Sequence, residues 1–542
     1  MTLSTSARIA SELGVLVPIG GGYSAETVRR FGGLLPGDRS IIAVVPSACA
    51  YSGLPNAVEQ ADLIARITGH VARVVPLLVR ADSFVPAHVA VFDNRRLGGI
   101  FFLGGNQDEA MAMLVNTPVE AAMDRAFARG VVVGGTSAGD AVESHTMIAG
   151  PASGFTAMTG LRRKAVDVWW ADDLRRRGLC FGSRHVVLDS HFHQRGRMGR
   201  LLSVVARSAD RFGSPLLGVG IDTQTGTVLS NDRLLGPVFG QSSITIVDME
   251  NAAHRWAGRS QTLAARGIRI HLLAAGDGAT YDLERRAVWV HGVELSAASQ
   301  PWSVQSSARG TVLLSGGKAP LRLLIARARA GGRPLIQILS PDFPAAERAL
   351  RAAGWSGQIE QLTIGDTVSG ALLLIGVPGT RLGSAKRAAL RLLVTNAPLV
   401  ALDGTMSAAL GSYYVAGAPP SPGQREAAAI ISHRADGVVP SAGLGVLTAG
   451  VATGSMDGLF WGRLYALSRV RPDAAALGLS AASYAVCEAG KMIVGGGPVV
   501  ALNGRVARYR VGATGTLAAY NLILDVYVPG ECLPIQAGQG HE

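Results

Sequence analysis

The stretch VVVGGTSAGDAVESHTMIAG, residues 131–150, changes character in its middle. Its apolar, β-branched start predicts a buried strand, and the polar residues beyond the glycines are compatible with a helix. Ser137 stands at the junction, flanked by Gly135 and Gly139 in a G-x-S-x-G frame. This frame is typical of a nucleophile on a sharp strand-to-helix turn, but a serine that only caps a helix gives the same pattern.

Similar transitions occur before this stretch. Apolar runs end in glycine or other turn residues and alternate with amphipathic helical segments, as in VLVPIGGGYS (15–24), SIIAVVPSA (40–48) and GGIFFLGGNQ (98–107). Strands that alternate with helices form βαβ units on a mostly parallel sheet. The sequence therefore predicts an α/β fold of the three-layer, flavodoxin-like kind.

The second half of the chain repeats the order of the first. The stretch APLVALDGTMSAALGSYYVAG, residues 397–417, matches the serine stretch but carries Met406 in place of Ser137. The offset is 269 residues from Gly135 to Gly404 and 263 from Arg200 to Arg463. A coherent offset near half the chain indicates a tandem duplication. We expect one domain at residues 1–295, a serine- and alanine-rich linker at 296–310, and a second domain at 311–542.

Two more segments of the first half carry candidate site residues. LDSHFHQRGRMGRLL (188–202) contains His191, a candidate general base, and the arginines Arg195, Arg197 and Arg200. Arginine forks bind carboxylates bidentately, although such a charged run also forms solvated helix starts, here with Asp189 as the cap. In GGIFFLGGNQDE (98–109), backbone amides at a strand end could stabilise an oxyanion, with Gln107 reaching into the site.

In combination, these motifs resemble the cyanophycinase family of serine peptidases, relatives of the α-aspartyl dipeptidases on a class I glutamine-amidotransferase-like fold. The motifs are FFLGGNQ, GGTSAG, DSHFHQRGRMGRL and GVGID, in family order, with IGGG near the start. The family hydrolyses cyanophycin, a poly-aspartate whose side chains carry arginine. The resemblance implies Ser137 as nucleophile and His191 as base. It also implies an oxyanion hole formed by Gly105 and Ala138. The side chains that would hold charged substrate groups are Gln107, Asp189, Arg195, Arg197 and Arg200.

Two positions depart from the family pattern. Thr223 stands where the family has the glutamate of the triad, and Asp140 stands where it has alanine. Asp140 is our candidate for the acid, with Glu143 and Asp222 as alternatives, because a triad without an acid loses control of the histidine tautomer. The second copy has lost the chemistry altogether. Besides Met406, it has Gly454 for His191, Ala452 for Asp189, Gly458 for Arg195 and Phe460 for Arg197, and it keeps only Arg463.

Composition argues against several kinds of partner. The net charge is +12, but the basic residues are spread over all 542 positions without a nucleic-acid-binding motif, so we expect no nucleic-acid partner. The chain has no long apolar run and no signal-peptide pattern, which predicts a cytoplasmic protein without membrane contact. The four cysteines lack metal or disulfide spacing, and we expect no metal and no cofactor.

The leading interpretation is thus a serine exopeptidase or isopeptidase that acts on cyanophycin or β-aspartyl peptides. Two alternatives stay open, namely a peptidase for α-aspartyl or other acidic peptides and a catalytically inactive binding or scaffold protein. In each case the second half would be a pseudo-enzymatic domain that forms an internal pseudo-dimer, and further homo-oligomers are left open.

Overall fold

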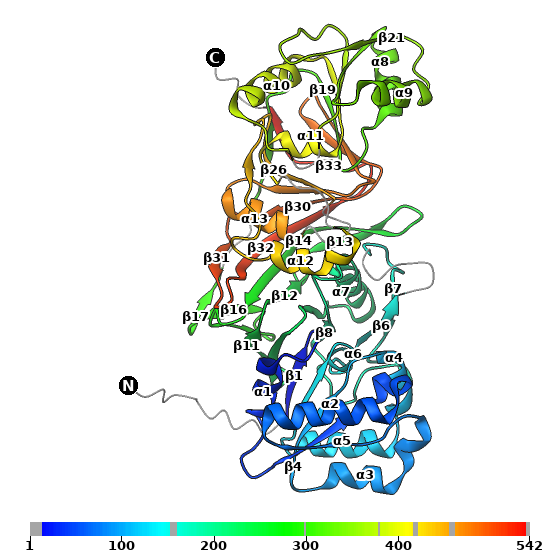
Figure 1. Cartoon of the computed structure of the whole chain (residues 1–542), viewed down its shortest axis with the longest axis vertical. Coiled ribbons are helices and arrows are strands. Elements are labelled where there is room, and N and C mark those ends of the chain that lie inside the picture. Colours follow the sequence, from blue (N-terminus) through cyan, green and yellow to red (C-terminus); the bar gives the residue numbers. More distant parts are fainter. Residues whose placement is uncertain are drawn as a thin grey trace.

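The computed structural model describes residues 14–151, 160–296, 300–377, 380–415, 421–454 and 461–537. A ten-stranded sheet forms around the run that leads to Ser137 (Figure 1). Strand β5 (Val132–Thr136) lies between β1 (Val15–Ile19) and β4 (Leu97–Phe102), and all three are parallel. The parallel array continues with β2 and β3, and antiparallel strands extend the other edge. Their bounds are β2 Ile41–Val45, β3 Val71–Val74, β10 Thr225–Ser230, β11 Leu234–Gly240, β15 Ala279–Asp282, β16 Ala287–Val290 and β17 Val293–Leu295.

Helices cover both faces of this sheet because both faces are apolar. Val17 and Ile19 of β1 pack with residues of α1 and α2, whereas Leu16 faces the core under α3, α4 and α5. The arrangement is the three-layer α/β fold that the sequence predicts. The antiparallel extension makes the sheet mixed, which strand and helix alternation alone did not indicate. The helices are α1 Ala25–Gly32, α2 Gly53–Thr68, α3 Pro86–Asp93, α4 Gln107–Leu114 and α5 Pro118–Ala128, with 3₁₀ turns at Ser47–Ser52 and Arg80–Phe84.

The far end of the molecule repeats this design in an eight-stranded sheet. Its strand order, β21-β20-β22-β23-β19-β28-β29-β33, follows the order β3-β2-β4-β5-β1-β10-β11 of the first sheet. The strands are β19 Thr311–Ser315, β20 Leu335–Leu339, β21 Gln358–Gln361, β22 Ala371–Leu374, β23 Leu399–Leu402, β28 Tyr484–Glu488, β29 Lys491–Gly495 and β33 Cys532–Leu533. The helices are α8 Leu321–Ala330, α9 Phe343–Ala352, α10 Ser384–Asn396 and α11 Gly404–Ala409. This shared order supports the tandem duplication.

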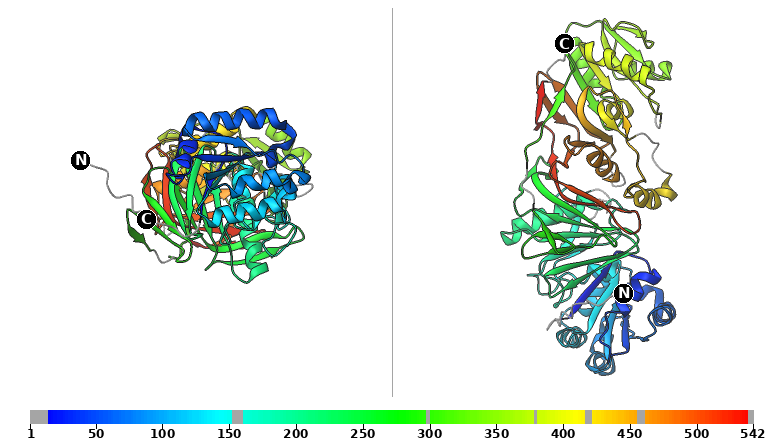
Figure 2. Two further views of the ribbon diagram at one scale, coloured as in Figure 1. Left: turned by 90° about the horizontal axis from the view of Figure 1, so that it is seen from below. Right: turned by 90° about the vertical axis from the view of Figure 1, so that its left-hand side faces the viewer.

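A third sheet joins the two halves along the middle of the elongated molecule (Figures 1 and 2). Strand β14 (Thr262–Ala274) of the first half pairs antiparallel with β32 (Leu517–Tyr527) of the second. On one side follow β12, β9 and β8, and on the other β30, β27, β26, β24 and β25. The strands are β8 Val186–Asp189, β9 Leu217–Ile221, β12 Ser243–Asp248, β24 Gly411–Tyr414, β25 Ser441–Ala442, β26 Leu447–Thr453, β27 Ala476–Leu479 and β30 Val499–Asn503.

The remaining elements flank this central sheet. Strands β13, β18, β31 and β34 pair with its members, and β6 and β7 form a separate hairpin. They span β6 Met147–Pro151, β7 Val166–Trp169, β13 Ala253–Ala257, β18 Val304–Ser306, β31 Arg508–Val511 and β34 Ile535–Ala537. The helices are α6 Ala138–Ala141, α7 Met198–Phe212, α12 Arg425–Ser432 and α13 Trp461–Val470, with a 3₁₀ turn at Pro422–Gln424. Within the described residues, every helix is too short or too polar to span a bilayer.

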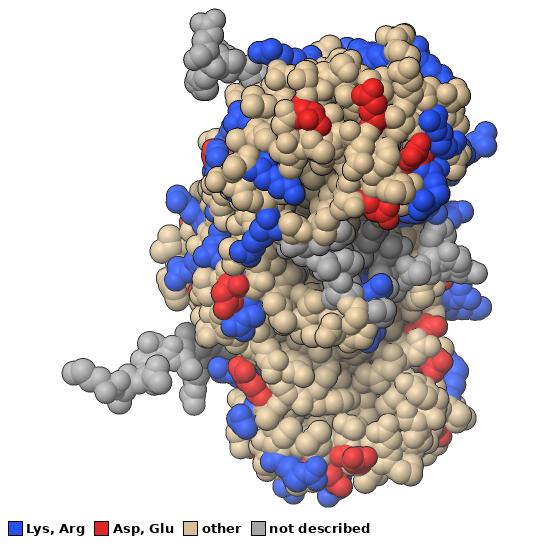
Figure 3. All heavy atoms as spheres, turned by 45° about the horizontal axis from the view of Figure 1, so that its top comes forward, with Lys and Arg blue, Asp and Glu red and all other residues tan. Residues whose placement is uncertain are grey.

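We place the proposed boundary between the halves at residues 296–310. Part of that segment is the short strand β18, which pairs with β26 and β34 of the second half. The two outer sheets fall on opposite sides of the boundary, whereas the central sheet crosses it. On the face seen in Figure 3, Lys and Arg side chains are spread over both halves, with Asp and Glu among them.

Candidate active site

Ser137 lies on a sharp turn between β5 and α6. Its backbone has φ +58° and ψ −112°, a conformation that non-glycine residues rarely adopt. The turn is closed by a hydrogen bond from the Ser137 amide to the Ile19 carbonyl (2.9 Å). A Cβ atom at Gly135 would lie 2.3 Å from the Gly139 carbonyl oxygen, so the turn requires glycine there. The local geometry is that of a strained nucleophile turn rather than an ordinary helix cap, and the Ser137 side chain makes no capping bond to α6.

The Ser137 hydroxyl contacts a histidine from another part of the first half. The Nε2 atom of His191 lies 2.8 Å from the Ser137 Oγ, and its Nδ1 lies 3.1 Å from the Oγ1 of Thr223. If Nδ1 carries the proton and donates to Thr223, Nε2 is free to accept the proton of the serine hydroxyl. The three side chains therefore form a serine–histidine–threonine chain.

Backbone contacts fix the position of His191. Its amide donates to the Gly20 carbonyl (2.7 Å) in the loop after β1, and its own φ is +43°. Gly21 lies directly against the imidazole ring, since a Cβ atom there would be 2.3 Å from His191 Cε1. The IGGG segment near the start of the sequence thus packs against the histidine ring and fixes its position.

The surroundings of His191 favour its neutral form. Burial lowers its pKa to about 3, and the positive charges of Arg195, Arg197 and Arg200 act in the same direction. A neutral imidazole is the state that accepts a proton from a nucleophile. The same charges oppose formation of the imidazolium, and the described neighbours that bond to its ring nitrogens are two hydroxyl groups.

The two predicted oxyanion-hole residues follow neighbouring strands, Gly105 after β4 and Ala138 after β5. Gly104 and Gly105 follow β4, and a Cβ atom at Gly104 would lie 3.3 Å from the Cβ of Ser137. Gly105 has φ +150° and approaches the Ala48 carbonyl so closely that no side chain fits. Among the described residues, neither the Gly105 amide nor the Ala138 amide donates a hydrogen bond. Both are available to an incoming oxyanion.

The predicted substrate-binding arginines fall into two groups. Arg197 and Arg200 are buried and form ion pairs with the buried Asp189; Arg200 Nε lies 2.8 Å from Asp189 Oδ2, and Arg197 Nη1 lies 3.3 Å from Oδ1. Arg197 also donates to the Ser190 carbonyl (2.6 Å). Asp189 therefore binds arginines of its own segment, and the three side chains together carry one net positive charge. In the described part of the chain, the Nε of Arg197 has no hydrogen-bond partner.

Arg195 and Gln107 lie apart from this buried group. Arg195 is half-exposed and faces Glu426 of helix α12, in the second half, at 3.4 Å. Gln107 begins helix α4, and its Nε2 donates to the Ile148 carbonyl (2.9 Å). The structure thus brings Ser137 of the first sheet and His191 of the central sheet together, whereas Gln107 is already engaged by the protein.

Asp140 does not occupy the position of a triad acid. The structure puts Thr223 at His191 Nδ1, and among the described residues the Asp140 carboxyl has no hydrogen-bond partner at all. Burial raises the pKa of Asp140 well above its usual range, with a further contribution from the charge of Asp189. Glu143, one turn further along, is buried in the same way and its pKa is also raised well above its usual range by burial. Burial therefore disfavours the charged form of both carboxyls.

The third candidate acid, Asp222, is engaged elsewhere. It accepts hydrogen bonds from the backbone amide of His193 and the Ser242 hydroxyl, and lies 3.0 Å from His193 Nδ1. The His193 ring stacks on His433 with centroids 3.6 Å apart, and its Nε2 lies 3.4 Å from the Tyr465 hydroxyl. His433 and Tyr465 belong to the second half. Because His193 and Asp222 flank the residues that carry the candidate site, the second half packs directly behind it.

This contact between the halves is the part of the site that sequence reasoning missed. Gln194, whose Oε1 accepts the Thr223 amide at 3.2 Å, belongs to the same polar run as the candidate site residues, but the sequence assigned it no role. The histidine in HFH at residue 193 was the available signal, since a buried histidine requires partners. Its partners lie more than 200 residues away in the chain, and no local pattern identifies them.

Where the structure describes it, the matched region of the second half lacks both the serine and the histidine. Met406 lies inside helix α11, and its Sδ faces Gly376 much as the Ser137 side chain faces Gly104. Asp403 caps that helix by accepting the Met406 amide (2.8 Å). Ala452 lies near the carboxyl end of β26, and Gly454 is the first residue after that strand. The matched residues Gly458 and Phe460 lie outside the described part of the chain.

Comparison with known proteins adds the family context. No protein-family model matches the chain. The chain is similar to the cyanophycinase of Nostoc sp., with 33% identity over 279 residues, 49% of this chain and 85% of that protein. Cyanophycinase of Geminocystis herdmanii is 30% identical over 261 residues, 47% of this chain and 88% of that protein. Among solved structures, the chain resembles a peptidase from an acI-B1 actinobacterium, with a TM-score of 0.32, 21% identity, and coverage of 44% of this chain and 91% of that one.

Proposed function

Because the chain belongs to the cyanophycinase family of serine peptidases, we propose that Ser137 is its nucleophile and His191 its general base. The observation that carries the proposal is the 2.8 Å contact between Ser137 Oγ and His191 Nε2 at a strained strand-to-helix turn. The proposed site uses side chains of the first half for chemistry. The second half acts as a pseudo-enzymatic partner that packs behind them.

The proposed reaction is a two-step acyl transfer. Ser137 Oγ attacks the scissile carbonyl carbon while its proton passes to His191 Nε2, and the carbonyl oxygen becomes an oxyanion within reach of the Gly105 and Ala138 amides. The tetrahedral intermediate then collapses, the C–N bond breaks, and His191 returns the proton to the leaving nitrogen. Water repeats the sequence on the acyl-serine and releases the acid and the free serine.

With Thr223 in place of the acid, this chain has a weaker version of the serine–histidine–acid triad. A hydroxyl at Nδ1 accepts one hydrogen bond and so fixes the ring orientation and tautomer, as a carboxylate would. It offers no negative charge to the imidazolium that forms in the transition state. We therefore propose an active but slow hydrolase.

The substrate class we propose is an acidic peptide, with cyanophycin or β-aspartyl peptides first. Support comes from the charge balance beside Ser137. Asp189 offsets only one of Arg197 and Arg200, and burial raises the pKa of the nearby Asp140, which disfavours a second negative charge there. The net positive charge that remains favours a substrate that carries a carboxylate. An α-aspartyl peptide presents the same group and is the alternative substrate.

One substrate panel tests the proposal. Purified protein is incubated with cyanophycin, with a synthetic β-aspartyl-arginine peptide and with an α-aspartyl dipeptide, and products are identified by mass. We expect release of β-aspartyl-arginine from cyanophycin by the wild type and none by Ser137→Ala. Cleavage of the α-aspartyl peptide alone would move the substrate class to the alternative. Absence of cleavage in all three arms at high enzyme concentration would favour an inactive binding protein. Thr223 in place of the triad acid is consistent with that outcome.

A further inference from the structure

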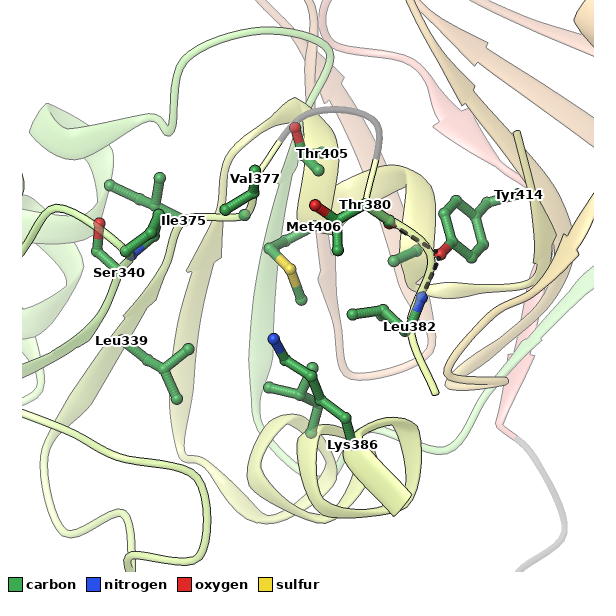
Figure 4. A pocket seen from close by; sticks show the side chains of 14 residues that line it. Leu339, Ser340, Ile375, Val377, Thr380, Leu382, Lys386, Thr405, Met406 and Tyr414 are labelled. Atoms are coloured by element: carbon green, nitrogen blue, oxygen red, sulfur yellow. Dashed lines mark hydrogen bonds between the residues drawn. The ribbon is translucent and has the colours of Figure 1, made fainter. Parts of the chain in front are cut away.

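The second half contains a cavity at the place that corresponds to the proposed active site of the first (Figure 4). It lies where β20, β22 and β23 end and helix α11 begins, and its volume is about 230 Å³. In parallel α/β sheets, ligands bind at this carboxyl edge. Met406 and Thr405 from α11 form one wall, and Leu382 and Lys386 stand opposite them.

The lining is apolar apart from a few groups. Aliphatic side chains supply most of the surface, namely Leu339, Ile375, Val377, Leu382, Leu390 and Met406. Lys386, on the first turn of α10, is the one charged residue of the lining, and in Figure 4 its ammonium group points toward Met406. Within the described part of the chain, Lys386 forms no ion pair.

The hydroxyls of Ser340, Thr380 and Thr405 also line the cavity, and the other polar groups nearby are used by the protein. The Tyr414 hydroxyl accepts the Leu382 amide (3.2 Å) and lies 3.4 Å from the Thr380 carbonyl. Asp403 is not among the residues that line the cavity. Its carboxylate accepts the Met406 and Gly376 amides at 2.8 and 3.1 Å. A bound molecule would therefore meet one free cation, Lys386, and no acidic side chain of the lining.

From this chemistry we propose that the cavity binds a short aliphatic carboxylate, with its carboxylate at Lys386 and its hydrocarbon chain against Met406. The cavity is smaller than the roughly 300–1,000 Å³ of pockets that hold drug-sized ligands, so the chain must be short. A zwitterionic amino acid, arginine or an aspartyl-arginine dipeptide does not fit, because its cationic group would be buried without a partner. The site is thus distinct in ligand class from the peptidase site that we propose in the first half.

The test is titration of the full chain with hexanoate, followed by calorimetry and by saturation-transfer NMR. Hexan-1-ol, hexylamine and arginine are the comparison ligands. We expect saturable binding of hexanoate, weaker binding of hexan-1-ol, and none of hexylamine or arginine. Lys386→Gln should weaken hexanoate binding by about two- to fivefold, the range for one solvent-accessible charge pair, and leave hexan-1-ol unchanged. The control Lys491→Gln, an exposed lysine on β29, should leave both affinities unchanged.

A second variant locates the site. Met406→Trp should fill the cavity and abolish binding of both hexanoate and hexan-1-ol, with its thermal transition recorded as a check on folding. The proposal is overturned if wild-type protein shows no saturable hexanoate binding, if Lys386→Gln binds hexanoate as wild type does, or if folded Met406→Trp still binds. Repeating the titration in Ser137→Ala separates this proposal from the peptidase proposal, because hexanoate binding should not depend on the serine.

Discussion

At the scale of single residues, the site rests on an imidazole that is kept neutral without help from a carboxylate. Burial and three nearby arginines lower the pKa of His191 to about 3, far below the ordinary histidine value near 6.5. The sequence predicted the serine, the histidine and the substitution by Thr223. It did not predict that Asp140, Glu143 and Asp222 are all engaged or buried away from the ring, because burial and hydrogen bonding depend on the packed fold.

The first prediction concerns pH. His191 must be neutral to accept the serine proton. Because its pKa is lowered, the imidazole stays neutral until the pH falls to that pKa. We therefore expect kcat/KM to be flat from pH 8 down to about pH 5 and to fall only below it, with folding followed by circular dichroism at each pH. Arg195→Gln should move the acid limb upward, since it removes one positive charge near the ring. An acid limb near pH 6.5 in the wild type would contradict this description of His191.

The second prediction concerns the missing acid. Thr223→Glu should place a carboxylate at His191 Nδ1 and raise kcat by at least about tenfold, within the ~10⁴ that a triad acid can be worth. The added negative charge should also shift the acid limb of the profile to higher pH.

Asp140→Asn is the matched control for Thr223→Glu. Because burial raises the pKa of Asp140 and its carboxyl has no hydrogen bond to His191, an uncharged side chain of the same shape should change kcat less than about threefold and Tm by less than about 5 °C. A large loss of kcat in Asp140→Asn, with no gain in Thr223→Glu, would return Asp140 to the role of triad acid.

At the scale of elements, the residues of the proposed site come from loops of two neighbouring sheets. The loops after β1, β4 and β5 supply Gly21, Gly105 and Ser137, and His191 follows β8 of the neighbouring sheet. Apolar periodicity predicted these strands and the elbow, since each strand is a continuous buried run. It could not predict the antiparallel strands β10, β11 and β15–β17, whose pairing depends on which sheet edge is left open once the parallel core has formed.

The third prediction tests the loop after β1. Gly21→Ala should displace the His191 ring, because the new Cβ would lie 2.3 Å from Cε1 and because φ is +135°. We expect kcat to fall by more than about a hundredfold, since small displacements of reacting groups cost that much. Gly37→Ala, at an open position with no atom within 4 Å, is the control and should keep wild-type turnover. Equal activity in the two variants would show that Gly21 does not position the histidine.

At the scale of the whole molecule, the duplication has become one continuous structure. The pairing of β14 with β32 carries the central sheet across the boundary, and the His193–His433 stack joins the halves behind the proposed site. The sequence showed the repeat but not this junction, because both strands read as ordinary buried strands and nothing local identifies their partner.

The fourth prediction follows from that junction. Residues 1–295 expressed alone would expose the long edge of β14 and the apolar residues that share a core cluster with α13, and unpaired edges of this kind promote association. We expect this fragment to elute in size-exclusion chromatography as a dimer or aggregate and to lose most of its turnover. A monomeric fragment with wild-type kcat would show that the second half is dispensable for the site.

The most direct test of the central claim is to locate the nucleophile. The protein is treated with a fluorophosphonate, and the modified residue is identified by peptide mass spectrometry in the wild type, in Ser137→Ala and in the exposed-serine control Ser214→Ala. The account predicts one modification, on Ser137, in the wild type and in Ser214→Ala, and none in Ser137→Ala. A wild type that resists the reagent while folded, or that is modified at a serine of the second half, would contradict it.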